Sequence, residues 1–415
     1  FGLGRYSFIG SDPFLLLISR CGETQMISHN DRLSLCGDPF DILREQLNRY
    51  QVDASSCPVP FVGGAVGYFG YDLCHSIEQL PITTLDDMGV PDYCLAFYDA
   101  VVAYDHVENK VYIVSTGFPE VELSRREMRA RQRADELRHL ICQQGWHNDS
   151  VCQSPPQSHY LSQNVNKTGE VRLNFTHNAY IKAVGKALEH ITAGDIFQVN
   201  LSQRFEAALN VDPYELYLRL RGINPAPFAC YLNFGDVTVA GASPERFLHL
   251  DGDTVETRPM KGTRPRGKSP AEDSLLASEL INSEKDRAEN IMIVDLERND
   301  LGRVCECGSV DVRGLYTLEK YATVFQLTST VTGNLKKDKD RIDLLRAAFP
   351  GGSVTGAPKI RAMEIIDELE PIRRGIYTGS IGYLGFDGIM DLNIVIRTFI
   401  VKGERVYFQV GGGIV

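Results

Sequence analysis

The sequence lacks long apolar runs and an excess of positive charge. No stretch of its 415 residues approaches the roughly 20 apolar residues that a membrane-spanning helix needs, so we expect no membrane partner. The formal net charge is −11, whereas nucleic-acid binding needs Lys and Arg clustered over one face. The sequence therefore predicts no nucleic-acid partner either.

Cysteine pairing is also missing from the sequence. Ten cysteines are scattered along the chain, and none forms a Cys-x-x-Cys pair or a Cys/His spacing typical of zinc. This usage is typical of a reduced intracellular protein, so we expect a cytoplasmic location. The chain begins at Phe1 without a Met, so a removed targeting segment, including one for an organelle, stays open.

The apolar content is ample for a globular protein, because hydrophobic residues make up 43% of the chain. Residues 1–145 contain short β-type runs and predict a β-rich N-terminal half. Residues 146–175 are polar and contain Pro155 and Pro156, as a linker or long surface loop does. Residues 176–415 mix helical and strand patterns and form the second predicted region.

Helical signals recur in this second region. Thr176 and Ser269 are predicted N-caps of two helices. A further helix is predicted from Ser283 to Asn299, and its segment Ile291–Leu296 is apolar nearly all round, as in a buried helix. Glu289 would then lie within a turn of the interior, where a carboxylate needs an arginine or a metal as its partner.

Two strand patterns have one polar face each. Residues 196–205 alternate, and their polar side predicts either a solvent-exposed face or the lining of a cleft; its members are Gln198, Asn200, Ser202 and Arg204. Residues 391–401 predict one continuous strand in which Arg397 points away from the apolar face. The segments GAVGYFGYD at 64–72 and GSIGYLGFD at 379–387 echo one another, which suggests two halves built on a related strand-turn unit.

Two segments offer backbone amides to an anion. Thr355 is a predicted N-cap within PGGSVTGAPKIRAMEIIDELEP at 350–371, and amides at that helix start would suit an anion, although an ordinary cap is the alternative. The closing GGGIV at 411–415 would leave consecutive amides uncovered, as in a nest for a carboxylate.

The basic segment ETRPMKGTRPRGK at 256–268 places one lysine between proline-containing turns. Pro259 and Pro265 restrict the backbone around Lys261, so we expect this amine to be held in position. Neighbouring arginines would depress its pKa; they are Arg258, Arg264 and Arg266. A neutral amine is a nucleophile. The alternatives are a solvated lysine in a basic turn and a Schiff-base lysine for pyridoxal phosphate, although no phosphate-cradling loop is evident.

Together, these motifs resemble the chorismate-utilising enzyme family over most of the chain. The family-specific segments are GRYSFIGSDP at 4–13, GDIFQVNLSQRF at 194–205, SPERF at 243–247, TRPMKGTRPRG at 257–267, DRAENIMIVDLERNDLGRV at 286–304, GAPKIRAMEIIDELEP at 356–371, GSIGYLG at 379–385 and the closing GGGIV. The resemblance implies an α+β fold, with large antiparallel sheets in a sandwich flanked by helices.

Two positions discriminate within the family. The lysine at position 261 resembles the branch that makes 4-amino-4-deoxychorismate, because other branches usually have alanine there. Water-adding members have a lysine where this chain has Gln198. The resemblance implies that Lys261 attacks carbon 2 of chorismate and that ammonia then attacks carbon 4, on the route to 4-aminobenzoate and folate. An anthranilate synthase and a catalytically silent chorismate-binding subunit are the alternatives.

The resemblance also implies roles for other residues and for partners. Glu245 would be the general acid, and Glu289 would bind Mg²⁺. Substrate contacts would come from Thr263, Thr355, Tyr383, Arg397, Gly412 and Gly413. Ser11 matches a region that binds an effector in relatives. A glutamine amidotransferase would supply ammonia. Taken alone, Glu245 would suggest a surface salt bridge, and Arg397 a cross-strand pair.

The chain departs from the family pattern at two places. Relatives continue beyond GGGIV into a helix with a second metal-binding glutamate, so we expect that the chain is partial and that its metal site is incomplete at Val415. Gln326 stands where relatives often have a histidine near the substrate.

Overall fold

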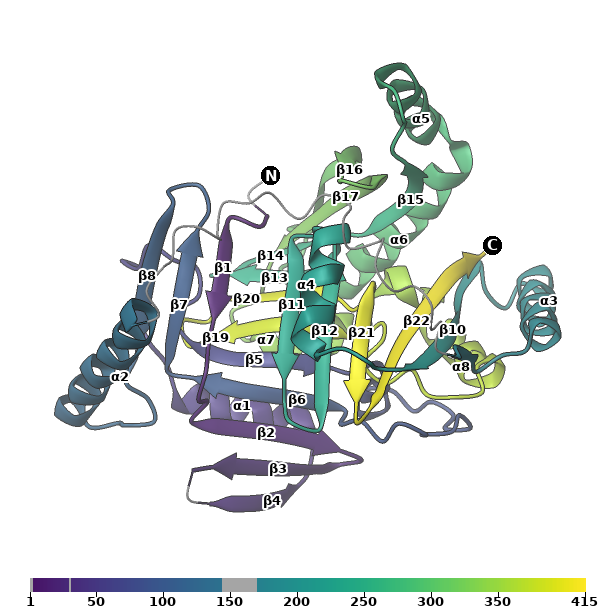
Figure 1. The fold of residues 1–415 in the computed structure, drawn as a ribbon. Coiled ribbons are helices and arrows are strands. Elements are labelled where there is room, and N and C mark those ends of the chain that lie inside the picture. The colour runs from purple at the N-terminus through teal and green to yellow at the C-terminus, as the bar shows by residue number, and fades with distance from the viewer. Residues whose placement is uncertain (1–2, 30, 144–169) are drawn as a thin grey trace.

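The computed structural model describes residues 3–29, 31–143 and 170–415, and most of the predicted linker lies outside them. Three antiparallel sheets form the framework (Figure 1). The 12-stranded sheet runs in the order β15 (Met260–Pro265), β17 (Val324–Asn334), β14 (Thr254–Thr257), β13 (Arg246–Asp251), β20 (Met390–Ile394), β19 (Ser380–Gly385), β5 (Gly64–Phe69), β6 (Tyr93–Tyr98), β2 (Leu15–Arg20), β3 (Glu23–Ser28) and β4 (Arg32–Cys36), with β16 (Asp311–Lys320) on β17.

The other two sheets are smaller. The 7-stranded sheet has the order β11 (Phe228–Asn233), β12 (Val237–Ser243), β21 (Thr398–Lys402), β22 (Arg405–Ile414), β10 (Gln198–Ala208) and β18 (Gly356–Ala357), with β9 (Arg172–Leu173) on β10. The 3-stranded sheet has the order β1 (Tyr6–Ile9), β7 (Ala100–Asp105) and β8 (Lys110–Ser115). The 12-stranded sheet takes strands from both sides of residues 146–175, and the boundary there stays a prediction.

The helices begin and end close to their sequence signals. Thr176 and Ser269 are confirmed as N-caps, because each hydroxyl accepts a hydrogen bond from an amide three residues on. The helices are α1 (Pro39–Arg49), α2 (Leu123–Gln143), α3 (His177–Ala193), α4 (Pro213–Ile223), α5 (Pro270–Asn282), α6 (Glu284–Gly302), α7 (Arg341–Ala348) and α8 (Lys359–Leu369), with short 3-10 turns η1 (Tyr71–Ser76) and η3 (Gly352–Val354). Among the described residues, no helix is both long enough and apolar enough to cross a membrane.

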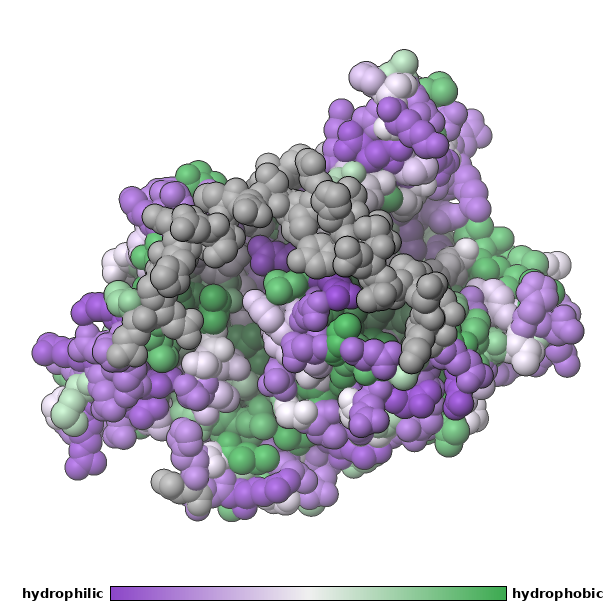
Figure 2. All heavy atoms as spheres, in the orientation of Figure 1, coloured by the Kyte–Doolittle hydropathy of each residue, from purple (hydrophilic) through white to green (hydrophobic). Residues whose placement is uncertain are grey.

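The core has the layers of a sandwich. One cluster between the two large sheets joins Tyr68 and Ile381 of the larger sheet to Val239 and Ile400 of the smaller. A second cluster joins the 12-stranded sheet to α1, α6 and α7, and a third joins β10 to α3 and α8. The predicted α+β sandwich with flanking helices is confirmed. The α5 lobe projects at the top of the view in Figure 1, and its visible surface is mainly hydrophilic in Figure 2.

The two echoing sequence segments are neighbours in the larger sheet. They form β5 and β19, which pair antiparallel with Gly67 opposite Gly382. A Cβ on Gly67 would lie 1.9 Å from the Cys94 carbonyl oxygen, and one on Gly382 would lie 1.9 Å from the Asp391 carbonyl oxygen. Both glycines therefore permit the same close approach to a flanking strand.

The strand predicted over 391–401 is wrong as a single element. The chain forms β20 in the 12-stranded sheet, leaves it, and re-enters the 7-stranded sheet as β21. Arg397 lies in the break with a left-handed φ of +52°, which interrupts the extended backbone. Its side chain is thus placed by the crossing between sheets and not by strand alternation.

The polar side of β10 is buried, so its predicted exposure to solvent is wrong. Gln198 and Ser202 are at most 1% exposed, whereas Phe197 just before the strand is 71% exposed. Glu370, at the end of α8, accepts hydrogen bonds of 2.8 Å from the amide and hydroxyl of Ser202. Arg374 then pairs with Glu370 at 2.7 Å, and both side chains are at most 2% exposed.

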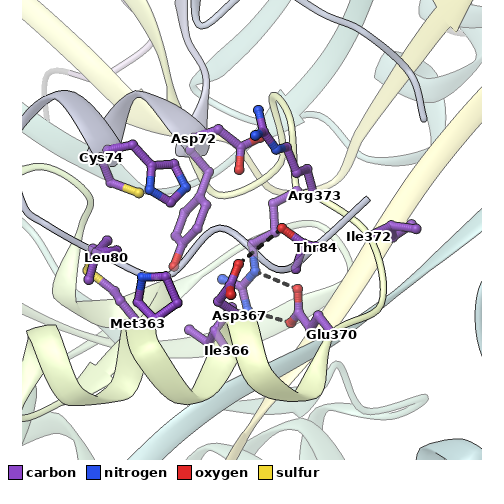
Figure 3. Close-up of a pocket in the computed structure, with 14 residues that line it drawn as sticks. Asp72, Cys74, Leu80, Thr84, Met363, Ile366, Asp367, Glu370, Ile372 and Arg373 are labelled. Carbon is purple, nitrogen blue, oxygen red and sulfur yellow. Dashed lines mark hydrogen bonds and ion pairs between the residues drawn. The ribbon is translucent and has the colours of Figure 1, made fainter. Parts of the chain in front are cut away.

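Arg374 joins four segments through this pair. Its guanidinium donates to the carbonyl oxygens of Asn200 on β10 and Val354 in η3, and to the Thr378 hydroxyl. Glu370, just after the end of α8, and residues of η1 line a cavity of about 20 Å³. Figure 3 is a close-up of this cavity. The guanidinium also lies 4.8 Å from the Tyr71 ring centroid. These contacts fix η3 against β10.

Replacement of Arg374 tests this junction. Arg374→Met leaves Glu370 buried and unpaired, which should lower the free energy of unfolding by about 3–5 kcal/mol. Arg361→Met is the matched control, because Arg361 lies on the neighbouring α8 in a half-exposed pair with Glu364 and should cost less than about 1 kcal/mol. Urea unfolding measures both values. Equal losses in the two variants would contradict the structural role of Arg374.

Candidate active site

Lys261 lies on β15 at the edge of the larger sheet. The pairing of β15 with β17 slips between Lys261 and Thr263, at Gly262, whose φ is +79°. The Lys261 Nζ donates a 2.7 Å hydrogen bond to the Ser353 carbonyl oxygen in η3. Lys261 is half-buried and held in one position, as its sequence context predicts.

The pKa of Lys261 is lowered, but the predicted cause is wrong. Burial lowers the pKa, and three carboxylates oppose the change: Glu245, Glu289 and Glu297. The nearby arginines are engaged with acidic side chains. They form the pairs Arg258 with Glu319, Arg264 with Asp286 and Arg266 with Asp273. Desolvation, and not cationic neighbours, therefore favours the neutral amine.

Glu245 lies in the turn between β12 and β13 and is 4% exposed. Burial raises its pKa, while Ser353 and Lys261 act in the opposite direction. Its Oε1 accepts a 3.4 Å hydrogen bond from the amide of Met260, the residue before Lys261. A surface salt bridge is therefore excluded for Glu245. A buried carboxyl with a raised pKa can hold a proton near neutral pH and donate it.

Ser353 connects these two groups, and sequence analysis missed it. Its carbonyl oxygen binds Lys261, and its side chain acts on the pKa of Glu245. It lies in the glycine-rich segment before α8, where Gly351 and Gly352 pack tightly against neighbouring side chains. A serine in such a turn has no sequence signal beyond its position next to the glycines.

Helix α6 packs behind β15 and η3. The prediction that Ile291–Leu296 is buried all round is wrong, because Ile291 is 39% exposed and Asp295 faces solvent. The buried face of α6 instead contains polar side chains, including Glu297, which is 6% exposed. Burial and the charges of nearby carboxylates raise the pKa of Glu297 to about 8.

Arg397 faces the same region. The charge of Glu245 acts on the Arg397 guanidinium, whose pKa burial lowers. Three buried glutamines have carboxamide oxygens without hydrogen-bond partners among the described residues: Gln198, Gln326 and Gln409. Gln326 is the β17 neighbour of Thr263, two residues after Lys261. Arg397 therefore offers a cation to an anionic ligand, whereas the free carboxamide oxygens can accept hydrogen bonds only from donor groups.

Other predicted site residues have no contact with Lys261 among the described residues. Tyr383 on β19 packs against Phe61, with 4.6 Å between ring centroids. Thr263 is exposed on β15. Ser11 is exposed after β1, and its hydroxyl donates to Asp12 at 3.1 Å.

Two expectations about backbone amides are wrong. Thr355 is not an N-cap, because α8 begins at Lys359 and the buried Thr355 hydroxyl donates to the Gly351 carbonyl oxygen at 3.1 Å. Residues 411–414 continue β22, in which Gly412 pairs with Leu201 and Gly413 with Asn200 of β10. Strand pairing turns successive amides to opposite sides, so they cannot form a nest.

One carboxylate near Lys261 is suited to a metal. Glu289 on α6 is half-buried, and its nearest cation is the Lys285 ammonium at 3.7 Å, so of the two partners that the sequence left open the arginine is absent among the described residues. Among the described residues, no group of three or more His, Cys, Asp or Glu side chains is placed to bind a metal ion. Mg²⁺ fits a single carboxylate, because it usually keeps several waters and takes further oxygens from substrate.

Two cavities lie elsewhere in the described structure. The cavity of about 20 Å³ in Figure 3 has room for water only, since ligand sites are usually about 300–1,000 Å³. A second cavity, of about 440 Å³, lies between the large sheets beside Tyr68 and Phe234. Neither of these two cavities is lined by Lys261 or Glu245.

The layered fold brings the half-buried Lys261 amine and the buried Glu245 carboxyl into one site, and such a pair suits proton transfer. A family model described as chorismate binding enzyme matches residues 10–415. The chain belongs to this family and is a chorismate-utilising enzyme.

Individual relatives support the same family. Aminodeoxychorismate synthase component 1 of Bacillus subtilis (strain 168) is 39% identical, with 99% of this chain and 84% of the relative covered. Anthranilate synthase component 1 of Acetivibrio thermocellus is 40% identical, with 99% and 82% covered. The crystal structure of anthranilate synthase component I from Streptococcus pneumoniae TIGR4 superposes with a TM-score of 0.83 at 33% identity, covering 99% of this chain and 87% of that one.

Gly262 provides a test of how Lys261 is held. Gly262→Ala adds a Cβ 2.9 Å from Leu280 Cδ1 at a left-handed φ, so it should destabilise the protein by about 1–3 kcal/mol and slow chorismate consumption. Gly252→Ala is the control, because Gly252 has a φ of +60° with open space around it. Urea unfolding and chorismate consumption measure the difference. Indistinguishable stability and activity in the two variants would contradict tight packing beneath Lys261.

Proposed function

We propose that this enzyme is an aminodeoxychorismate synthase component 1. It converts chorismate and ammonia to 4-amino-4-deoxychorismate, a precursor of 4-aminobenzoate and folate. The single observation behind this choice is the Lys261 amine, whose pKa burial lowers and which lies beside the buried Glu245. The similarity to the Bacillus subtilis aminodeoxychorismate synthase component 1 supports the same reaction.

The first step forms a covalent intermediate. Neutral Lys261 attacks carbon 2 of chorismate, both double bonds of the ring diene shift, and the bond between carbon 4 and its hydroxyl oxygen breaks. Glu245 donates the proton with which the hydroxyl leaves as water. Before the reaction, Lys261 must lose a proton and Glu245 must gain one. Transfer of a proton from Lys261 to Glu245 therefore prepares both groups.

The second step releases the enzyme. Ammonia attacks carbon 4, both ring double bonds shift back, and the bond between carbon 2 and the Lys261 nitrogen breaks. Ammonia comes from a glutamine amidotransferase partner, a proposal that the component 1 names of the relatives support. We propose that the reaction takes place in the cytoplasm.

The substrate's two carboxylates need cationic or hydrogen-bonding partners. Arg397 is the principal one, because its guanidinium faces Glu245 at the reacting end of the site. Tyr383 and Thr263 are assigned lesser contacts. Gly412 and Gly413 are assigned backbone contacts from the free edge of β22, and Thr355 a structural contribution through Gly351. Ser11 remains the candidate effector residue of the N-terminal half.

Mg²⁺ would be held by Glu289 together with a substrate carboxylate and water. When bound, the ion neutralises negative charge on the substrate and orients its ring carboxylate. The residues of the chain then perform the proton transfers and the nucleophilic attack.

Anthranilate synthase component 1 is the second candidate function. The relative from Acetivibrio thermocellus, at 40% identity, and the Streptococcus pneumoniae structure favour it. Incubation with chorismate, ammonia and Mg²⁺ followed by mass spectrometry and chromatography separates the candidates. Anthranilate as the product would reject our choice, and retained chorismate binding without turnover would favour a silent subunit.

Lys261→Ala tests the covalent step. Without ammonia, wild-type protein mixed with chorismate should gain the mass of chorismate less water on the peptide containing Lys261. The variant should form no adduct, and its amination rate should fall by at least about tenfold, because the nucleophile is gone. Lys268→Ala, on the same basic segment but exposed, should retain both properties. An unchanged amination rate in Lys261→Ala overturns the mechanism.

Glu289→Gln tests the metal assignment. Loss of the carboxylate charge should raise the Mg²⁺ concentration for half-maximal activity about tenfold or more, since Mg²⁺ prefers anionic oxygen ligands. Glu284→Gln removes an exposed charge from the same helix and should leave the Mg²⁺ titration unmoved. If both variants titrate as wild type does, Glu289 does not bind the ion.

A further inference from the structure

Glu297 is a buried carboxyl behind the active-site lysine that the proposed mechanism does not use. It belongs to the buried face of α6, the helix that packs against β15 and η3, and is 6% exposed. Its Oε2 accepts a hydrogen bond from the Thr257 hydroxyl, four residues before Lys261. Thr257 is itself 2% exposed, so water does not solvate this contact.

The surroundings of Glu297 provide no direct cation. Within the described part of the chain, it forms no ion pair, and the nearest helical acid, Asp300, is paired with Lys359 at 2.5 Å. The groups that act on Glu297 are the carboxylates of Glu245 and Asp300, the Lys359 ammonium and the Thr257 hydroxyl. The groups that act on Lys261 are the carboxylates of Glu245, Glu289 and Glu297.

We propose that Glu297 is a positioning residue for Lys261, and that the charge on its carboxyl sets the pH at which the lysine amine loses its proton. The role of Lys261 as the nucleophile rests on the proposed function, but the electrostatic coupling does not. While Glu297 is protonated it adds no charge behind the lysine, and the amine loses its proton more easily.

The direction of the effect follows from the charges. The pKa of Glu297 is about 8, so its carboxyl is largely neutral at pH 7 and becomes anionic as the pH rises. An anion beside Lys261 stabilises the ammonium form and raises the pKa of the amine. Ionisation of Glu297 therefore holds the Lys261 proton to a higher pH than burial alone would.

Chemical labelling of the lysine tests this coupling without chorismate. Limiting acetic anhydride is added to the protein from pH 6 to 10.5, and acetylation of Lys261 is measured by peptide mass spectrometry, with the exposed Lys285 as internal reference. In Glu297→Gln, the midpoint of the Lys261 profile should fall to a lower pH, because the variant lacks the anion that favours the ammonium form.

Three further variants complete the test. Thr257→Val removes the hydrogen bond that favours the Glu297 anion, so it should also lower the midpoint. Glu297→Asp restores the ionisable group and should return the midpoint toward that of wild type. Asp295→Asn removes the same charge from the exposed side of α6 and should leave the midpoint unmoved. Near-UV circular dichroism checks that each variant is folded.

The outcomes separate this inference from the proposed function. A midpoint that is unchanged in both Glu297→Gln and Thr257→Val overturns the role of Glu297, even if chorismate forms its adduct on Lys261. A lowered midpoint with no chorismate adduct supports the coupling and rejects the nucleophilic role of the lysine. An equal shift in Asp295→Asn also overturns the inference, since the effect would then reflect only net charge.

Discussion

The buried pair between Arg374 and Glu370 is the constraint on which the catalytic geometry depends. Two opposite charges removed from water must satisfy one another and their remaining hydrogen bonds, or the fold loses stability. Here Glu370 binds Ser202 of β10, and Arg374 binds Val354 of η3. The pair therefore fixes η3 against the smaller sheet, and η3 holds the carbonyl oxygen that receives the Lys261 ammonium.

The contacts with η3 bring together a lysine whose pKa is lowered and a glutamate whose pKa is raised. Lys261 comes from the edge of the larger sheet, Glu245 from the turn between β12 and β13, and Ser353 acts on both. Burial makes the amine a weaker base and the carboxyl a weaker acid, so their pKa values approach one another. The two shifts lower the cost of moving a proton between them, which is what the proposed roles of Lys261 and Glu245 require.

The sequence singled out candidate site residues more readily than it predicted the surroundings of those residues. The family resemblance singled out Lys261 and Glu245, and in the structure the charge of each acts on the pKa of the other, while their catalytic roles stay a proposal. Ser353 and Glu297 were not, because a serine in a glycine-rich turn and a glutamate on a helix are ordinarily exposed. The lowered pKa of Lys261 was predicted for the wrong reason. The arginines adjacent in sequence are paired with acidic side chains, and desolvation causes the shift. No local sequence pattern encodes desolvation.

Local sequence determined three features: the helix starts at Thr176 and Ser269, the strand repeats at 64–72 and 379–387, and the restrained backbone around Lys261. Helix capping, strand alternation and proline geometry each act over only a few residues, so the sequence alone was sufficient for them. Tertiary structure decided that the polar side of β10 is interior, that the chain changes sheets at Arg397, and that Glu297 lies behind the lysine. These outcomes depend on which surfaces meet, since burial and charge are set by neighbours far away in the chain.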